Sequence, residues 1–221
     1  MKKNLLLSIL IIALIAITAT GCKKTEEIYA CDPITNEWVK SNLQTIQKMN
    51  RQDLLQLDLE KQIPAFRAFS PEQKYNCWAD KLEHVKKLEW TEKEFIHINL
   101  LAESIKLEWF EDNFKKKNFD EIDNFLKKWV NDSFSYFGWT KDEVGRMVAC
   151  LDDVEMEDGN VILRGPVGGG IGGGVKIPTC NCNQKWDFCG TGDKCKSIVC
   201  SEISGCGLLW LYTCNGKCDD I

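Results

Sequence analysis

The chain has 221 residues, of which 44% are hydrophobic and 28% are charged, and its formal net charge at pH 7 is -5. This mildly acidic chain has no basic stripe, which argues against nucleic acid as a partner, and its length allows one domain of average size plus a small unit. Twelve residues are cysteines, and eight of them lie between Cys180 and Cys218. Such density predicts a disulfide-stabilised segment that folds in an oxidising compartment.

The first 21 residues have the pattern of a bacterial secretory signal peptide. Two lysines form a basic start, and the apolar run Leu5–Thr18 follows them. This run is shorter than the roughly 20 residues that a membrane-spanning helix needs. The small residues before Cys22 resemble a bacterial lipobox, which implies cleavage after Gly21 and diacylation of the Cys22 thiol. We therefore expect a lipoprotein whose partner is membrane lipid, held through Cys22.

Residues 22–34 are expected to form a tether between the anchor and the helices. In many bacteria, an Asp directly after the acylated cysteine retains a lipoprotein in the inner membrane. No Asp follows Cys22 here, so we expect the chain to be anchored in the outer membrane. A Lys followed by paired acids resembles a surface-export signal of some Gram-negative lipoproteins, although Thr25 interrupts it. A solvated tether is the alternative, and the periplasmic and surface-exposed leaflets both stay open.

Residues 35–151 are predicted to form an all-α bundle of five or six short helices, because their apolar residues recur at helical spacing. Ser70, Thr91 and Thr140 each begin a capping box, with Gln or Glu three residues later. A further helix carries apolar residues up to Phe137 and is expected to end at Gly138.

Two earlier helices are expected in the same domain. One covers residues 36–49, and the other covers residues 52–63 and ends before Pro64, because the residue before a proline disfavours helical backbone.

The helical domain has no residue set that predicts catalysis, so we expect no enzyme, no cofactor and no metal. His84 and His97 are the only histidines, and Cys77 with His84 lacks a second ligand pair at zinc-like spacing. Cys77 and Cys150 both lie on expected helices and are candidates for an additional disulfide, whereas the pairing of Cys31 stays open.

Residues 152–178 are expected to form a short hairpin around Asp158–Gly159, followed by a glycine-rich linker. Gly168, Gly170 and Gly173 match the spacing of a dinucleotide-binding fingerprint. We reject that interpretation because no helix pattern follows these glycines. The segment instead resembles a flexible connection between two folding units, and it is also a candidate site for proteolytic release.

Residues 179–221 are predicted to form a small, mostly irregular module, held together by disulfides because it is too short to build a sufficient apolar core. Its cysteines are Cys180, Cys182, Cys189, Cys195, Cys200, Cys206, Cys214 and Cys218. Eight cysteines allow 105 pairings, so the connectivity stays open. Zinc would require Cys-x-x-Cys pairs or paired histidines, which this segment lacks.

Large apolar residues lie between these cysteines. They include Trp186, Phe188, Leu208, Leu209, Trp210 and Tyr212. A module of this size cannot bury all of them, and exposed aromatic patches mark contact sites for proteins or membranes. The alternative is that Trp210 packs across the disulfides as a minimal core of the module.

The pattern of the cysteine-rich end resembles the bacteriocin fulvocin C-related protein family. The resemblance is carried by three segments, Cys180–Cys182, Gly205–Leu211 and Cys214–Cys218, while the helical region matches only in layout. It implies an antibacterial module on an exported chain, acting on an unidentified bacterial target on contact or after proteolytic release. The alternative is a non-toxic envelope binding module or a protease inhibitor displayed on a helical stalk.

Overall fold

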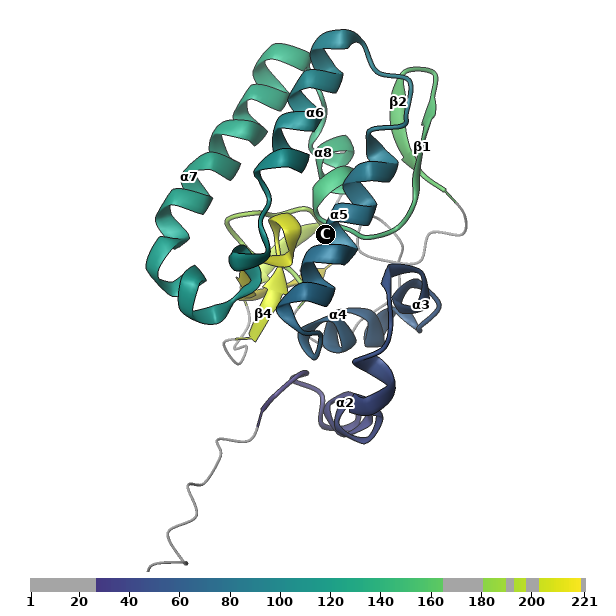
Figure 1. The fold of residues 1–221 in the computed structure, drawn as a ribbon, viewed down its shortest axis with the longest axis vertical. Helices are drawn as coiled ribbons and strands as arrows, with labels where there is room; N and C mark the ends of the chain where they lie inside the picture. Colours follow the sequence, from purple (N-terminus) through teal and green to yellow (C-terminus); the bar gives the residue numbers. More distant parts are fainter. Residues whose placement is uncertain (1–26, 165–180, 190–192, 198–202, 220–221) are drawn as a thin grey trace, which may run out of the picture.

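The computed structural model describes residues 27–164, 181–189, 193–197 and 203–219 (Figure 1). Its helices are α2 (Pro33–Ile46), α3 (Arg51–Leu55), α4 (Leu59–Arg67), α5 (Pro71–Val85), α6 (Glu92–Ser104), the 3₁₀ turn η1 (Leu107–Phe110), α7 (Asp112–Phe137) and α8 (Lys141–Val148). No helix within these ranges is both long and apolar enough to cross a bilayer. The expected signal peptide, Cys22 and the glycine-rich segment lie outside the described residues.

Side-chain caps determine where three of the helices begin. The Ser70 hydroxyl accepts a hydrogen bond from the Gln73 N–H, and the Gln73 side chain accepts one from the Ser70 N–H. Thr91 and Thr140 begin α6 and α8 with the same reciprocal pair of bonds. Gly138 ends α7 in the left-handed conformation, with φ of 68°. These local predictions are confirmed.

The N-terminal helices differ from the prediction. The single helix expected over residues 52–63 is two helices, α3 and α4, and α4 begins after Asp58. Pro64 lies inside α4 and is buried, so its ring contributes to packing while only one intrahelical hydrogen bond is lost. With these two, the described residues contain seven α-helices instead of five or six, and α7 is long, at 26 residues.

Helices α5 to α8 surround the upper half of the core, and α2 to α4 lie below them (Figure 1). The long helix α7 runs antiparallel to α6, as Figure 1 shows. His97 on α6 stacks on the Trp129 ring of α7, with centroids 4.7 Å apart, and its Nε2 atom lies 2.9 Å from the Ser133 hydroxyl oxygen. This histidine therefore belongs to the packing between the two helices.

The hairpin expected around Asp158–Gly159 is present. Strands β1 (Val154–Glu157) and β2 (Asn160–Leu163) pair antiparallel. Asp158 and Gly159 both have positive φ, as a two-residue hairpin turn requires. The valines that face inward from the two strands are buried against the helices.

The C-terminal segment forms two further antiparallel pairs, so the module expected to be mostly irregular is not purely irregular. Strand β3 (Lys194–Ser197) pairs with β6 (Gly216–Asp219), and β4 (Ile203–Cys206) pairs with β5 (Tyr212–Cys214). The short turn η2 (Leu208–Trp210) lies between β4 and β5. Strands of three or four residues are too short for an alternating pattern to reveal them in the sequence.

Candidate functional site

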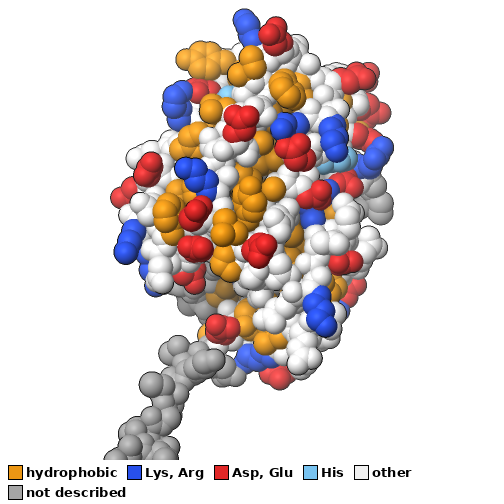
Figure 2. All heavy atoms as spheres, in the orientation of Figure 1, with side chains coloured by type: hydrophobic (Ala, Val, Ile, Leu, Met, Phe, Trp, Pro, Cys, Tyr) orange, Lys and Arg blue, Asp and Glu red, His pale blue; other side chains and the backbone are white. Residues whose placement is uncertain are grey.

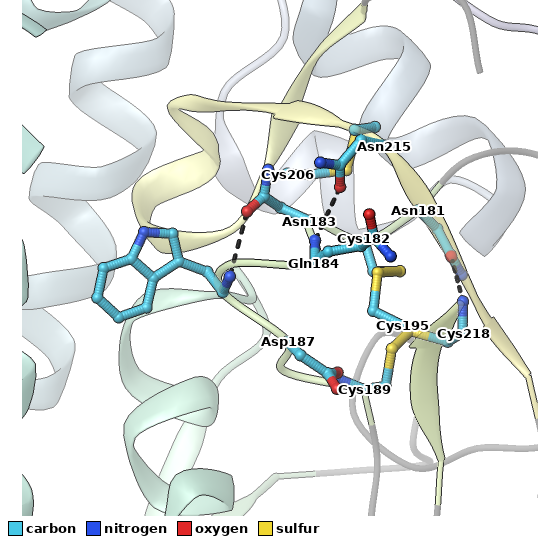
Figure 3. The surroundings of a disulfide bond; sticks show 12 residues. Asn181, Cys182, Asn183, Gln184, Asp187, Cys189, Cys195, Cys206, Asn215 and Cys218 are labelled. Carbon is cyan, nitrogen blue, oxygen red and sulfur yellow. Dashed lines mark hydrogen bonds between the residues drawn. A yellow bond between two sulfur atoms is a disulfide. The ribbon is translucent and has the colours of Figure 1, made fainter. Parts of the chain in front are cut away.

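Three disulfides hold the C-terminal module together. They join Cys182 to Cys195, Cys189 to Cys218, and Cys206 to Cys214, with Cα–Cα distances of 5.9, 5.5 and 5.1 Å respectively (Figure 3). Six of the eight cysteines predicted to form disulfides are therefore bonded. The other two, Cys180 and Cys200, lie outside the described residues.

The Cys182–Cys195 disulfide lies so close to strand β6 that only glycine fits at position 216. A Cβ atom on Gly216 would be 2.5 Å from the Cys195 sulfur and 3.2 Å from the Cys182 sulfur. The Gly216 N–H donates to the Cys182 carbonyl, and the Gly216 carbonyl accepts from the Cys182 N–H. The absent side chain allows the backbone and this disulfide to share one small volume.

Asparagine side chains satisfy backbone groups where regular structure is short. The Asn181 side-chain oxygen accepts a hydrogen bond of 3.0 Å from the Cys218 N–H, and the Asn215 side-chain oxygen accepts one of 2.8 Å from the Gln184 N–H (Figure 3). These bonds join the segment before β3 to β6 and its neighbouring loop. The disulfides and the asparagines together give this part of the chain a defined conformation.

The sulfur atoms of Cys182, Cys189 and Cys195 lie within 4.8 Å of one another. They are the only set of histidine, cysteine and carboxyl groups close enough for one metal ion in the described part of the chain. A metal binds the thiolate form of cysteine, whereas these sulfurs are shared in disulfides. In this oxidised form the three cysteines cross-link the module through two disulfides.

The apolar run of the module is buried in the helical domain, so the predicted contact surface is wrong. Leu208 and Leu209 are 0% exposed, and Trp210 and Tyr212 are 8% and 4% exposed. Trp186 and Phe188 are half-buried against the same core. The run shares one continuous hydrophobic cluster with the helices. The sequence argument failed because it treated residues 179–221 as a separate unit.

Trp210 contacts three helical segments, so the alternative of a core within the module is also wrong. Its ring stands edge-on to Phe66, with centroids 4.8 Å apart, and edge-on to Trp78, with centroids 5.9 Å apart. Its indole N–H donates a 2.9 Å hydrogen bond to the carbonyl of Ala149. Trp210 thus connects α4, α5 and the end of α8.

The backbone is strained where the run turns into the core. Leu209 and Trp210 have φ of 50° and 51°, in the left-handed region. That conformation costs a non-glycine residue roughly 1–2 kcal/mol. Burying a tryptophan side chain of about 150–250 Å² contributes about 4–6 kcal/mol at roughly 25 cal/mol per Å². The burial of Trp210 outweighs the backbone strain, so we expect this turn to depend on the apolar surface of the helices that Trp210 packs against.

A charged network connects the module to α7. The buried Asp123 carboxylate accepts hydrogen bonds from the Tyr212 hydroxyl at 2.9 Å and from the Lys185 ammonium at 2.7 Å. Lys127 forms an ion pair with the same carboxylate at 2.8 Å. Burial alone would raise the pKa of Asp123, but these hydrogen bonds hold it below its usual value.

Arg67 connects α4 to both ends of the described chain. Its guanidinium donates to the Tyr29 carbonyl at 2.7 Å, to the Ser204 carbonyl at 2.6 Å and to the Cys214 sulfur. Gly205 has φ of 109° and passes so close that a Cβ there would lie 3.2 Å from the Arg67 Nε atom. Because no carboxylate accepts from it in the described part of the chain, burial lowers the pKa of Arg67 to about 10.

The additional disulfide expected between Cys77 and Cys150 is not formed. Each residue is 2% exposed, and they line different pockets, Cys77 with Arg51 and Cys150 with Trp210. The Cys150 thiol donates to the Arg146 carbonyl instead. Burial raises the pKa of the Cys77 thiol to about 12 and that of Cys150 to about 11, so both thiols are protonated at neutral pH.

Sequence reasoning did not single out Arg67, Asp123 or Lys185. Only Asp123 could have been found from the sequence. It lies three residues before Leu126 and seven before Val130, and therefore on the apolar face of α7. An acid at a core position of a helix indicates a buried partner.

No protein-family model, no curated protein and no solved structure matches this sequence. The resemblance to the fulvocin C-related family therefore stays a prediction from the cysteine pattern.

Proposed function

We propose that this chain is an exported, lipid-anchored envelope protein that antagonises competing bacteria through its whole folded domain. The lipobox-like sequence before Cys22 supports export and anchoring. The cysteine pattern of the C-terminal segment supports antagonism. Trp210 packs between Phe66 and Trp78, so the helices and the module share one hydrophobic core. This contact is the observation that supports action by the whole folded domain and not by the tail alone.

Action on contact fits this geometry better than release of the tail. A cut in the glycine-rich segment would leave the module attached to the helices by the Trp210 contacts and by the Lys185–Asp123 ion pair. A detached tail would expose Leu208 and Leu209 and would lose the packing that offsets its strained turn. The anchored chain would therefore act while its tail stays in place.

Mixed-culture competition tests this proposal. Producer cells with the native chain, with no chain, or with Cys22→Ser are each grown with a panel of related competitors, and purified oxidised residues 179–221 are tested separately. We expect killing by the native producers alone. If the isolated tail inhibits growth as strongly as the native producers, the whole-domain form is wrong. If native producers inhibit no competitor, antagonism itself is wrong.

A second candidate is a non-toxic binding module, and one observation favours it. Large apolar side chains are exposed on α6 and α7, at Phe95, Ile96, Leu100, Phe134 and Tyr136. Figure 2 shows exposed hydrophobic side chains on one face of the molecule with charged groups around them. Such a surface is typical of a protein contact site.

The two candidates differ in the residues they need. Leu100→Ser on the exposed face would weaken capture of an envelope partner by the full chain, measured by pull-down and mass spectrometry, while leaving any killing intact. Loss of killing with Leu100→Ser would instead place the antagonistic surface on α6.

A further inference from the structure

Two hollows meet beneath the N-terminal segment. The outer, open one has a volume of about 760 Å³ and is bordered by Tyr29, the end of α4 and the start of α5. The inner cleft has a volume of about 20 Å³, room for about one water-sized atom. Arg67, Lys74 and Asp112 border both hollows, so the two are continuous.

The inner cleft gathers positive charge from three different helices. Arg67 comes from the end of α4, Lys74 from the first turns of α5, and Lys115 from the first turn of α7. Asp112 is the one acidic residue that borders the cleft. Three cations and one carboxylate give the inner cleft a charge of +2, whereas Glu27 and Glu72 border only the outer hollow. The opposite walls include Trp210 and Leu211, which are apolar and exclude water.

The two lysines of the cleft have no anionic partner within hydrogen-bond range. Neither ammonium group forms a hydrogen bond or an ion pair with any described residue, and Lys74 lies 6.0 Å from the centre of the Phe66 ring. Burial, with a further contribution from Lys115, lowers the pKa of Lys74 to about 8. Burial also lowers the pKa of Lys115. Cations held together in this way are unstable unless an anion joins them.

The start of α7 lies at the same place, since Asp112 and Lys115 of its first turns border the cleft. Its N-cap residue, Glu111, makes no side-chain capping bond, so the first N–H groups of this 26-residue helix have no side-chain acceptor at their cap. The positive end of the helix dipole therefore lies beside Lys115 and strengthens the attraction for an anion.

We infer that the cleft between Arg67, Lys74 and Lys115 binds an oxyanion of the phosphate class. A phosphate group carries a charge of about -1.5 to -2 at pH 7, which is opposite in sign and similar in size to the +2 of the inner cleft. One of its oxygens fits the inner cleft, and the rest of the group, with any substituent, occupies the outer hollow. The Lys74 and Lys115 ammonium groups are the main donors, because the guanidinium of Arg67 already donates to two carbonyls and a sulfur.

Two sources of this chemistry are available in a bacterial envelope, a lipid headgroup and free phosphate. Glu27 borders the outer hollow and lies five residues after Cys22, a span of at most about 18 Å. If Cys22 is acylated, the hollow therefore lies within reach of the membrane surface. A lipid headgroup as the ligand depends on the proposed lipid anchor. The oxyanion site itself is argued from the described residues alone.

Binding to the full chain with Cys22→Ser, which cannot be acylated, tests the inference. Inorganic phosphate is titrated by calorimetry, and phosphatidylcholine vesicles with and without phosphatidic acid are tested by co-sedimentation. We expect binding of phosphate or of the phosphatidic acid vesicles, weakened about tenfold by Lys74→Gln or Lys115→Gln. Lys117→Gln is the matched control, because Lys117 is exposed on the same helix and does not border the cleft.

Each result has a defined meaning. Binding of phosphate that Lys74→Gln weakens supports the site with free phosphate as a ligand. Binding of phosphatidic acid vesicles that phosphate displaces and Lys115→Gln weakens supports a lipid headgroup. No binding in either arm, or binding that Lys117→Gln weakens as much as the two cleft variants do, overturns the inference. The thermal midpoint of the cleft variants should equal or exceed that of the native chain, which excludes misfolding as the cause. None of these results depends on bacterial killing, so the antagonism proposal stands or fails separately.

Discussion

The indole ring of Trp210 stands perpendicular to that of Trp78, with an interplanar angle of 89° and centroids 5.9 Å apart. Trp78 lies on α5 and is fully buried, whereas Trp210 lies in the turn η2, far along the chain. This edge-on contact makes the stability of the helices depend on the C-terminal segment.

Trp210→Ala should destabilise the helices as well as the tail. Removing a buried aromatic side chain typically costs about 3–5 kcal/mol, and the cavity would open between Phe66 and Trp78. Urea unfolding followed by far-ultraviolet circular dichroism measures the loss. Tyr136→Ala removes an aromatic residue that is 78% exposed on α7 and should change the unfolding free energy by less than about 0.5 kcal/mol. An unchanged midpoint for Trp210→Ala would show that the tail folds apart from the helices.

Asp123→Asn should weaken the connection between α7 and the tail and reduce the sensitivity of the fold to acid. The lysines around Asp123 are nearly half exposed, at 46% for Lys185 and 43% for Lys127, so we expect a loss of only about 1–2 kcal/mol at pH 7. The folded carboxyl has a lowered pKa, so its contribution is present above the unfolded value and is lost as pH falls through the folded value.

The Asp123 carboxyl is ionised in both states above its ordinary pKa of 3.8, so the difference in unfolding free energy between native and Asp123→Asn chains should be constant there and should shrink as pH falls below about 4. A difference that does not shrink below that pH would mean that the carboxylate is not specifically stabilised in the fold.

Gly216→Ala should disturb formation of the Cys182–Cys195 disulfide beside β6. The added carbon would lie 2.5 Å from the Cys195 sulfur and 2.8 Å from the Lys196 carbonyl oxygen, and the backbone oxygen cannot move without breaking the β3–β6 pair. We expect extra alkylatable thiols by mass spectrometry under non-reducing conditions. Gly159→Ala is the control, because that position is open and only its φ of 78° opposes the change, at about 1 kcal/mol. Equal thiol counts in both variants would refute the steric argument.

The thiols of Cys77 and Cys150 should resist alkylation in the native chain at pH 8 and react after denaturation. Both are buried, and their raised pKa values of about 12 and 11 leave almost no thiolate. Iodoacetamide labelling followed by peptide mass spectrometry measures each site. A peptide pair joined through these two cysteines would contradict the structure.

Lys74 should make the stability of the fold depend on alkaline pH. Its folded pKa of about 8 is below the ordinary value of 10.5, so between these values the folded chain binds fewer protons than the unfolded chain. The contribution of Lys74 to the unfolding free energy therefore rises as pH increases across that window. Comparison of native and Lys74→Gln chains isolates this contribution from Lys115 and the other groups nearby. A difference that stays constant with pH would show that Lys74 is solvated.

Features set by neighbouring residues could be predicted from the sequence, and those set by distant residues could not. The capping boxes at Ser70 and Thr140 and the turn at Asp158–Gly159 involve residues within four positions of one another, so their chemistry is visible in a short window. Two local expectations failed: the break between α3 and α4 at residues 56–58 was not predicted, and Pro64 was assumed to end a helix that in fact contains it.

The seat of Trp210 could not be predicted in the same way. Its partners Phe66, Trp78 and Ala149 belong to three separate segments, and no periodic pattern connects them. The many cysteines indicated that the C-terminal segment is too small to have its own core. Its apolar side chains are instead buried against the helices. A cluster such as Arg67, Lys74 and Lys115 is likewise assembled only when α4, α5 and α7 come together.

The buried position of Trp210 also constrains the order of folding during synthesis. Helices α4 and α5 are made well before Leu208 and Trp210, so the apolar surface around Phe66 and Trp78 has no cover until the C-terminal segment is complete. A chain truncated before this segment would keep that surface exposed to solvent and would be open to aggregation and proteolysis.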